Sequence, residues 1–182
     1  MNDNRRRLAK AFADYQARWP EEAAPPHFLD FLAAHADAFE RGLAIGHFTG
    51  SAWLVSADRR RVLLTHHRKL GLWLQPGGHA DGDDDLARVA LREAAEESGL
   101  DGLTPVPGIF DLDRHRIPAR AAEPEHWHYD VRYVVRAGKN EEFVVGEESH
   151  ALAWRDIAEV AEDPAADASV RRMAGKWINP TR

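Results

Sequence analysis

The sequence of 182 residues contains no cysteine, which excludes disulfide bonds, thiolate zinc sites and cysteine nucleophiles together and points to a reducing compartment. It also lacks any apolar run near the roughly 20 residues that a membrane-spanning helix needs. Basic residues are outnumbered, 24 against 30 acidic ones, for a formal net charge of -6, whereas surfaces that bind nucleic-acid polymers show a basic excess. We therefore expect a cytoplasmic protein that partners neither a nucleic-acid polymer nor a membrane.

The first part of the chain has the pattern of two helices. Apolar residues recur at helical spacing at Leu8, Phe12, Tyr15 and Trp19. A second series of apolar residues at helical spacing follows the helix-breaking segment PEEAAPP. Residues 4–41 are therefore predicted to form a helical hairpin, within an N-terminal helical extension (1–44) that precedes the main domain (45–182). The aromatic stripe either covers one side of a sheet or forms a homodimer contact. An exposed helix face explains the basic run at 5–7 better than a nucleic-acid contact does.

The rest of the chain is rich in strand patterns, which lie at 47–56, 61–67, 72–75, 108–115, 127–136 and 151–154. One strong helix is predicted from about residue 84 to residue 98, after a Gly-Pro loop. Two short helices are predicted at 155–161 and 165–177. Strands around a single strong helix, with further helices at the ends, are typical of an α+β layered domain with a mixed sheet.

The strong helix and the loop before it gather seven carboxylates, at Asp81, Asp83, Asp84, Asp85, Glu93, Glu96 and Glu97. Glu93, Glu96 and Glu97 share one helix face because they are three and four residues apart. Such a cluster costs stability unless a cation offsets the repulsion. Oxygen ligands select hard ions, so Mg²⁺ or Mn²⁺ is expected. On spacing alone, a solvated acidic face explains the cluster equally well.

The residues that flank this helix favour the metal site. Pro76, Gly77 and Gly78 predict a tight turn that lets the backbone approach the carboxylates closely. Asp83 or Asp84 is predicted to cap the helix N-terminus. Gly99 is predicted to end the helix in the left-handed conformation.

These residues resemble the signature of the Nudix hydrolases. That signature is Gly, five residues, Glu, seven residues, then Arg-Glu-aliphatic-x-Glu-Glu-x-Gly-aliphatic; here it runs from Gly78 to Leu100. Two positions depart from it: Asp84 stands where the family has Glu, and Ala94 is smaller than the usual aliphatic residue. The resemblance implies an α/β/α sandwich with a mixed sheet, and hydrolysis of a diphosphate linkage in a nucleoside diphosphate derivative by metal-activated water.

The resemblance also implies roles for individual residues. Glu93, Glu96 and Glu97 match the metal-binding glutamates, and Arg92 matches the arginine that orients one of their carboxylates. A further catalytic acid is expected from a later loop, where Glu147 and Glu148 are available and we choose Glu148. Contacts to the phosphorylated small-molecule substrate are expected from Gly77, Gly78, Lys69 and Arg132, although surface exposure explains the last two as well.

Four histidines form a second pattern. His126 and His128 are two residues apart on a predicted strand, so both project from one face. The segments HFTGSAW and LWLQPGGH resemble isopentenyl diphosphate isomerase, a branch of the same superfamily. That resemblance implies metal ligands at His47 and His79, and it places His126 and His128 where the isomerase has two glutamates. A second, transition-metal ion, Zn²⁺ or Mn²⁺, is therefore expected; the alternative is that the rings line a cleft or contact phosphate.

Two other functions compete with hydrolysis. The isomerase carries a catalytic cysteine two positions before its histidine, where this chain has Gly77. A Nudix-fold ligand sensor without turnover usually has eroded glutamates and an attached DNA-binding segment. Here the three glutamates are intact and the N-terminal hairpin does not resemble a recognition module. We therefore expect a pyrophosphohydrolase. The sequences of the loops around the box do not identify the organic part of its substrate.

Overall fold

The computed structural model describes residues 2–68, 71–119, 124–144 and 149–180. The chain begins with two helices, α1 (Asp3–Arg18) and α2 (Ala24–Ala34). The predicted helical hairpin is therefore confirmed, although α2 ends at Ala34 and turns follow it as far as the first strand. No helix in the described part of the chain combines the length and the apolar composition needed to cross a membrane.

The centre of the fold is one mixed sheet. Its strands are β1 (Gly46–Val55), β2 (Arg61–His67), β3 (Trp73–Leu74), β4 (Gly77–His79), β5 (Thr104–Ile117), β6 (His126–Arg136) and β7 (Ser149–Asp156). The main path is β3-β2-β1-β6-β5, with β4 paired to β1 and β7 to β2. The pairing of β1 with β6 is parallel, whereas the other strand pairings are antiparallel.

Two strands differ from the sequence prediction. The predicted Gly-Pro loop contains β4, which pairs with β1 at Thr49–Ser51. Strand β5 begins at Thr104 rather than at residue 108, despite Pro105 and Pro107. Prolines are tolerated there because β5 is the last strand of the path, where a missing N–H breaks few ladder bonds. The ladder also shifts register between Pro105 and Ile109.

The strong helix is α3 (Leu86–Ser98), and its capping residues set its ends. Its N-cap is Asp85, whose side chain accepts a hydrogen bond from the N–H of Arg88, so the prediction of Asp83 or Asp84 as the cap was wrong by one or two residues. Gly99 ends the helix at φ 66°, which confirms the predicted left-handed cap. The chain closes with α4 (Ile157–Glu162) and α5 (Ala168–Ile178).

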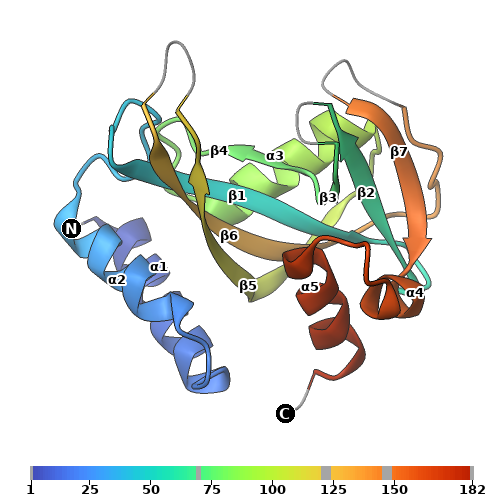
Figure 1. The fold of residues 1–182 in the computed structure, drawn as a ribbon, viewed down its shortest axis with the longest axis horizontal. Coiled ribbons are helices and arrows are strands. Elements are labelled where there is room, and N and C mark those ends of the chain that lie inside the picture. Colours follow the sequence, from blue (N-terminus) through green and yellow to red (C-terminus); the bar gives the residue numbers. More distant parts are fainter. Residues whose placement is uncertain (1, 69–70, 120–123, 145–148, 181–182) are drawn as a thin grey trace.

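Helices cover both faces of the sheet, as the α/β/α prediction required (Figure 1). On one face, α1, α2 and α3 share a core with alternate residues of β1 and β6, such as Phe48 and Tyr129. On the other face, α4 and α5 pack on Trp53, Val55 and Val134. Because successive residues of a strand point to opposite faces, each of the two central strands contributes to both cores.

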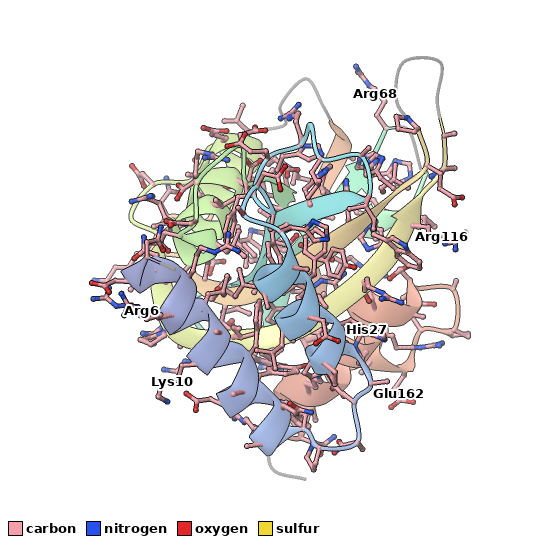
Figure 2. All side chains as sticks on the ribbon, turned by 90° about the vertical axis from the view of Figure 1, so that its left-hand side faces the viewer. Arg6, Lys10, His27, Arg68, Arg116 and Glu162 are labelled. Atoms are coloured by element: carbon pink, nitrogen blue, oxygen red, sulfur yellow. The ribbon has the colours of Figure 1, made fainter. Side chains whose placement is uncertain are left out.

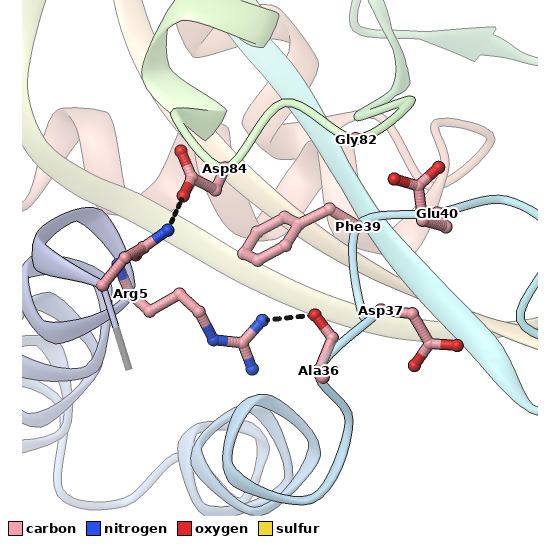
Figure 3. A pocket seen from close by; sticks show the side chains of 8 residues that line it. Arg5, Ala36, Asp37, Phe39, Glu40, Gly82 and Asp84 are labelled. Atoms are coloured by element: carbon pink, nitrogen blue, oxygen red, sulfur yellow. Dashed lines mark hydrogen bonds between the residues drawn. The ribbon is translucent and has the colours of Figure 1, made fainter.

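The N-terminal helices are tied to the domain by polar contacts as well as by aromatic packing. Asp84 accepts hydrogen bonds from the side chains of Asn2 and Asn4, each at 2.7 Å. Arg5 donates to the carbonyl of Ala36 at 3.0 Å, beyond the end of α2. Asn2, Arg5, Ala36 and Asp84 line a surface pocket of about 170 Å³ (Figure 3). In contrast, Arg6 points away from the body of the protein, as expected for an exposed helix face (Figure 2).

Candidate active site

Two box glutamates face the turn that contains β4. Glu97 Oε1 accepts a hydrogen bond from the backbone N–H of Gly77 at 2.8 Å. Glu93 Oε1 accepts one from Arg92 Nη2 at 2.9 Å, and the same arginine nitrogen donates to the backbone carbonyl of His79 at 3.1 Å. Arg92 therefore links the helix to β4 and fixes one carboxylate in place.

A side chain at either glycine of this turn would collide with a neighbouring side chain. A Cβ atom on Gly78 would lie 2.5 Å from the carboxylate of Glu93. A Cβ atom on Gly77 would lie 2.1 Å from Ser51 Oγ. The missing side chains let the backbone approach the helix closely, so the turn and the carboxylates form a single compact unit.

Most other carboxylates of the acidic segment already have partners. Arg41 holds Asp81 through two hydrogen bonds of 2.6 Å, and Arg88 holds Asp83. Asp84 binds α1 and Asp85 caps α3. Arginines, side-chain amides and a backbone N–H therefore bind four of the seven carboxylates, and Glu93, Glu96 and Glu97 are the candidate ligands of a bound cation.

Glu96 is exposed, whereas Glu93 and Glu97 are partly buried. In the described part of the chain, the three glutamates are not among the side chains whose ligand atoms converge tightly enough to mark a metal site. The oxygen donors and the glycine-lined turn nevertheless fit a hard dication such as Mg²⁺ or Mn²⁺.

The histidines do converge. His47 on β1 lies opposite His128 in the parallel ladder with β6, and ligand nitrogens of His47, His126 and His128 lie within 4.8 Å of one another. The ring centroid of His79, on β4, is 5.0 Å from that of His47 and 5.2 Å from that of His128. The structure thus brings together the four predicted histidines, with three of them as one tight group.

This histidine group lies on the sheet face opposite α3. A Cβ atom on Gly50 would meet the backbone oxygen of Leu86 in α3 at 2.8 Å, so the alternation of β1 points His47 to the other face. Burial and the neighbouring histidines lower the pKa of His47 to about 4 and that of His128 to about 2. Both rings are therefore neutral near pH 7 and do not offer positive charge to a phosphate.

Most of the main domain matches a known protein family. A family model described as the NUDIX domain matches residues 47–174. The chain belongs to the Nudix family. Its sheet, its covering helices and the position of the box helix agree with that assignment.

Individual relatives are more distant. An "m7GpppN-mRNA hydrolase" from Bos taurus is 33% identical over 101 residues, which cover 50% of this chain and only 33% of the bovine protein. A "Putative 8-oxo-dGTP diphosphatase 3" from Mycobacterium tuberculosis is 26% identical over 173 residues, or 83% of this chain and 75% of the relative. A crystal structure of a Nudix hydrolase from Clostridium perfringens superposes with a TM-score of 0.56 at 25% identity, covering 74% of this chain and 97% of that chain.

The other predicted site residues of this Nudix domain are placed as follows. Arg132 is 2% exposed, and its guanidinium contacts Asp130 at 2.7 Å, Asp111 at 3.2 Å and Asp113 at 3.4 Å. The guanidinium that we expected to contact substrate is thus paired with three carboxylates inside the protein. Lys69, Glu147 and Glu148 lie outside the described residues.

The sequence did not predict the buried polar network around Asp111. This carboxylate is fully buried and contacts Arg132, Arg172 and Lys176, the last at 2.6 Å. Burial alone would raise the pKa of Asp111, but the hydrogen bond from Arg172 and the three positive charges outweigh it and hold the pKa below its usual range. The alternation Asp111, Asp113, His115 on β5, opposite Arg132, Asp130 and His128 on β6, is the one signal in the sequence that marks this polar face.

Proposed function

We propose that this Nudix protein is a divalent-metal-dependent pyrophosphohydrolase that cleaves a diphosphate linkage in a small molecule, a nucleoside diphosphate derivative in the first instance. The observation that carries the proposal is the close fit between the box helix and the glycine turn. The Glu93 carboxylate lies where a side chain on Gly78 would be, and the N–H of Gly77 donates a hydrogen bond to Glu97. The names of the two sequence relatives, which describe hydrolysis of 8-oxo-dGTP and of m7GpppN-mRNA, support the same reaction class.

Glu93, Glu96 and Glu97 would hold Mg²⁺ or Mn²⁺. When bound, such an ion neutralises the charge of a diphosphate and activates water for attack on phosphorus. Arg92 contributes by fixing the Glu93 carboxylate through a charge-assisted hydrogen bond, while its second bond, to the carbonyl of His79, prevents the guanidinium from swinging away. Glu148 belongs to this proposal through the family resemblance alone.

Preorganisation is the physical advantage of this arrangement. Carboxylates that are held in advance by a backbone N–H and by an arginine need not be ordered when substrate arrives. The shared face of α3 presents them together, because residues four apart lie one turn above each other. The chain therefore supplies oriented negative charge at the place where a cation and a diphosphate would meet.

The test is hydrolysis of a defined panel with Mg²⁺ or Mn²⁺: ADP-ribose, dinucleoside polyphosphates, nucleoside triphosphates and NADH. Wild type should turn over at least one compound, and Glu97→Gln should abolish that turnover with a melting temperature within a few degrees of wild type. Glu162→Gln is the matched control, because Glu162 is exposed on α4 and distant from the box (Figure 2). Its activity should equal that of wild type.

Two results would overturn the proposal. The first is full activity in Glu97→Gln. The second is a folded wild-type protein that binds Mn²⁺ and any panel member but hydrolyses none, which would instead favour a ligand sensor.

A further inference from the structure

The strongest chemical feature outside the Nudix box is the group formed by His47, His126 and His128, called here the histidine triad. It is built from two neighbouring parallel strands, which fix the backbone positions of its members. His47 is 2% exposed and His126 is 8% exposed. Burying imidazole nitrogens at such depth is costly unless they have partners.

His47 is the member whose partners are missing. Both of its ring nitrogens are buried, and neither has a hydrogen-bond partner among the residues that the structure describes. A buried imidazole in a protein interior normally satisfies at least one nitrogen. The ring centroids of His126 and His128 are 5.0 and 4.8 Å from that of His47, and one nitrogen from each of the three rings lies within 4.8 Å of the other two.

The other two rings point nitrogens at each other. His126 Nε2 lies 3.3 Å from His128 Nε2. Two nitrogens bound at about 2.0 to 2.1 Å to one tetrahedral zinc ion stand about 3.3 to 3.4 Å apart, so the observed separation is that of two ligands on a shared ion. A hydrogen bond between the two rings would leave His47 unpartnered, whereas an ion would engage all three.

The orientation of His126 also suits a ligand. Its Nδ1 lies 2.9 Å from the carbonyl oxygen of Pro124, to which it can donate its proton. This contact fixes the tautomer in which Nε2 keeps its lone pair and faces His128. Metal-bound histidines are commonly held in this way by a carbonyl on the far side of the ring.

From this geometry we infer that the histidine triad binds one divalent d-block ion, with zinc as the reference case, at a site separate from the Nudix box. Neutral imidazoles prefer zinc, iron, nickel or copper to magnesium. The fourth position of a tetrahedral site would be bordered by the ring of His79, whose centroid is 5.0 Å from that of His47. The site is on the opposite sheet face from α3, so it needs no ligand from the box glutamates.

The test measures metal binding without substrate, so its outcome is independent of the proposed hydrolase activity. Tagless protein is stripped with a chelator and titrated with Zn²⁺ and with Co²⁺ as a spectroscopic probe, in excess Mg²⁺ to occupy the box. We expect the protein to bind one equivalent of Zn²⁺ tightly. With Co²⁺ we expect the visible absorption bands of an ion that has a low coordination number and nitrogen ligands. His126→Gln and His128→Gln should each weaken binding by about 100-fold or more.

Two controls separate this site from others. His27→Gln removes an exposed histidine on α2 and should bind as wild type does (Figure 2). Glu97→Gln alters the box and should also leave Zn²⁺ binding unchanged. If the triad variants fail to fold, nitrogen NMR of wild type should show zinc-dependent shifts of three histidine rings. Absence of tight binding in wild type, or equal binding in His126→Gln, would overturn the inference, as would an equal loss in Glu97→Gln.

Discussion

Replacing Gly78 with alanine tests the fit between the glycine turn and the box helix. The added Cβ would lie 2.5 Å from the carboxylate of Glu93, whereas ordinary van der Waals contact begins at 3.4 Å. The carboxylate must therefore move by about 0.9 Å. A misplacement of about 1 Å in a catalytic arrangement costs on the order of 100-fold in rate. Gly78→Ala should reduce kcat by about that factor.

The same substitution should leave the fold intact. Gly78 does not have a positive φ, so alanine can adopt its backbone conformation, and the atoms it meets are the far end of a flexible side chain. We expect the free energy of unfolding to change by less than about 1 kcal/mol, because no core packing is lost. The defect should therefore be in metal binding and turnover.

The assay compares wild type, Gly78→Ala and Gly42→Ala. Gly42 is the matched control because a Cβ there meets nothing within 4 Å. Turnover of the active panel member, Mn²⁺ affinity and urea unfolding are measured for each protein. Wild-type kcat and Mn²⁺ affinity in Gly78→Ala would refute the reasoning about the turn, and so would loss of folding.

Three further predictions follow from the polar contacts. Asp111→Asn should destabilise the protein by about 3 to 5 kcal/mol in urea unfolding, because two buried cations, Arg132 and Lys176, and the partly buried Arg172 lose their common counter-ion; a loss below about 1 kcal/mol would contradict this. The folded-state pKa values of Asp111 and Asp113 lie below the unfolded value of about 3.9, so their stabilisation is complete above that pH and is lost below it. The Tm of wild type should therefore fall below about pH 4, and less steeply in Asp111→Asn. Arg92→Lys should lower kcat by about 10-fold with little change in KM, because lysine cannot bind Glu93 and the His79 carbonyl in the same fork; a lower affinity for substrate with kcat unchanged would count against it.

Much of the fold follows from local patterns. The helix that carries Glu93 and Glu97 was predicted nearly to its ends, because a repeat near 3.6 residues and a terminal glycine are encoded within a few neighbouring residues. The main strands were found in the same way. The errors fell where tertiary context decides: β4 exists only because β1 offers it a partner, and β5 extends through two prolines only because it lies at the end of the path.

The residues of the candidate sites also fall into those that local sequence predicts and those that only tertiary structure brings together. The sequence by itself placed the box glutamates on one helix face and His126 beside His128 on one strand face, since both results depend only on bond geometry between near neighbours. Tertiary structure decided that His47 lies against them, that Arg132 is enclosed by aspartates, and that Asp84 binds the first helix. Those contacts join segments about 80 residues apart or bury a charge, and strand partners and burial are chosen by the packing of the whole chain rather than by any local pattern.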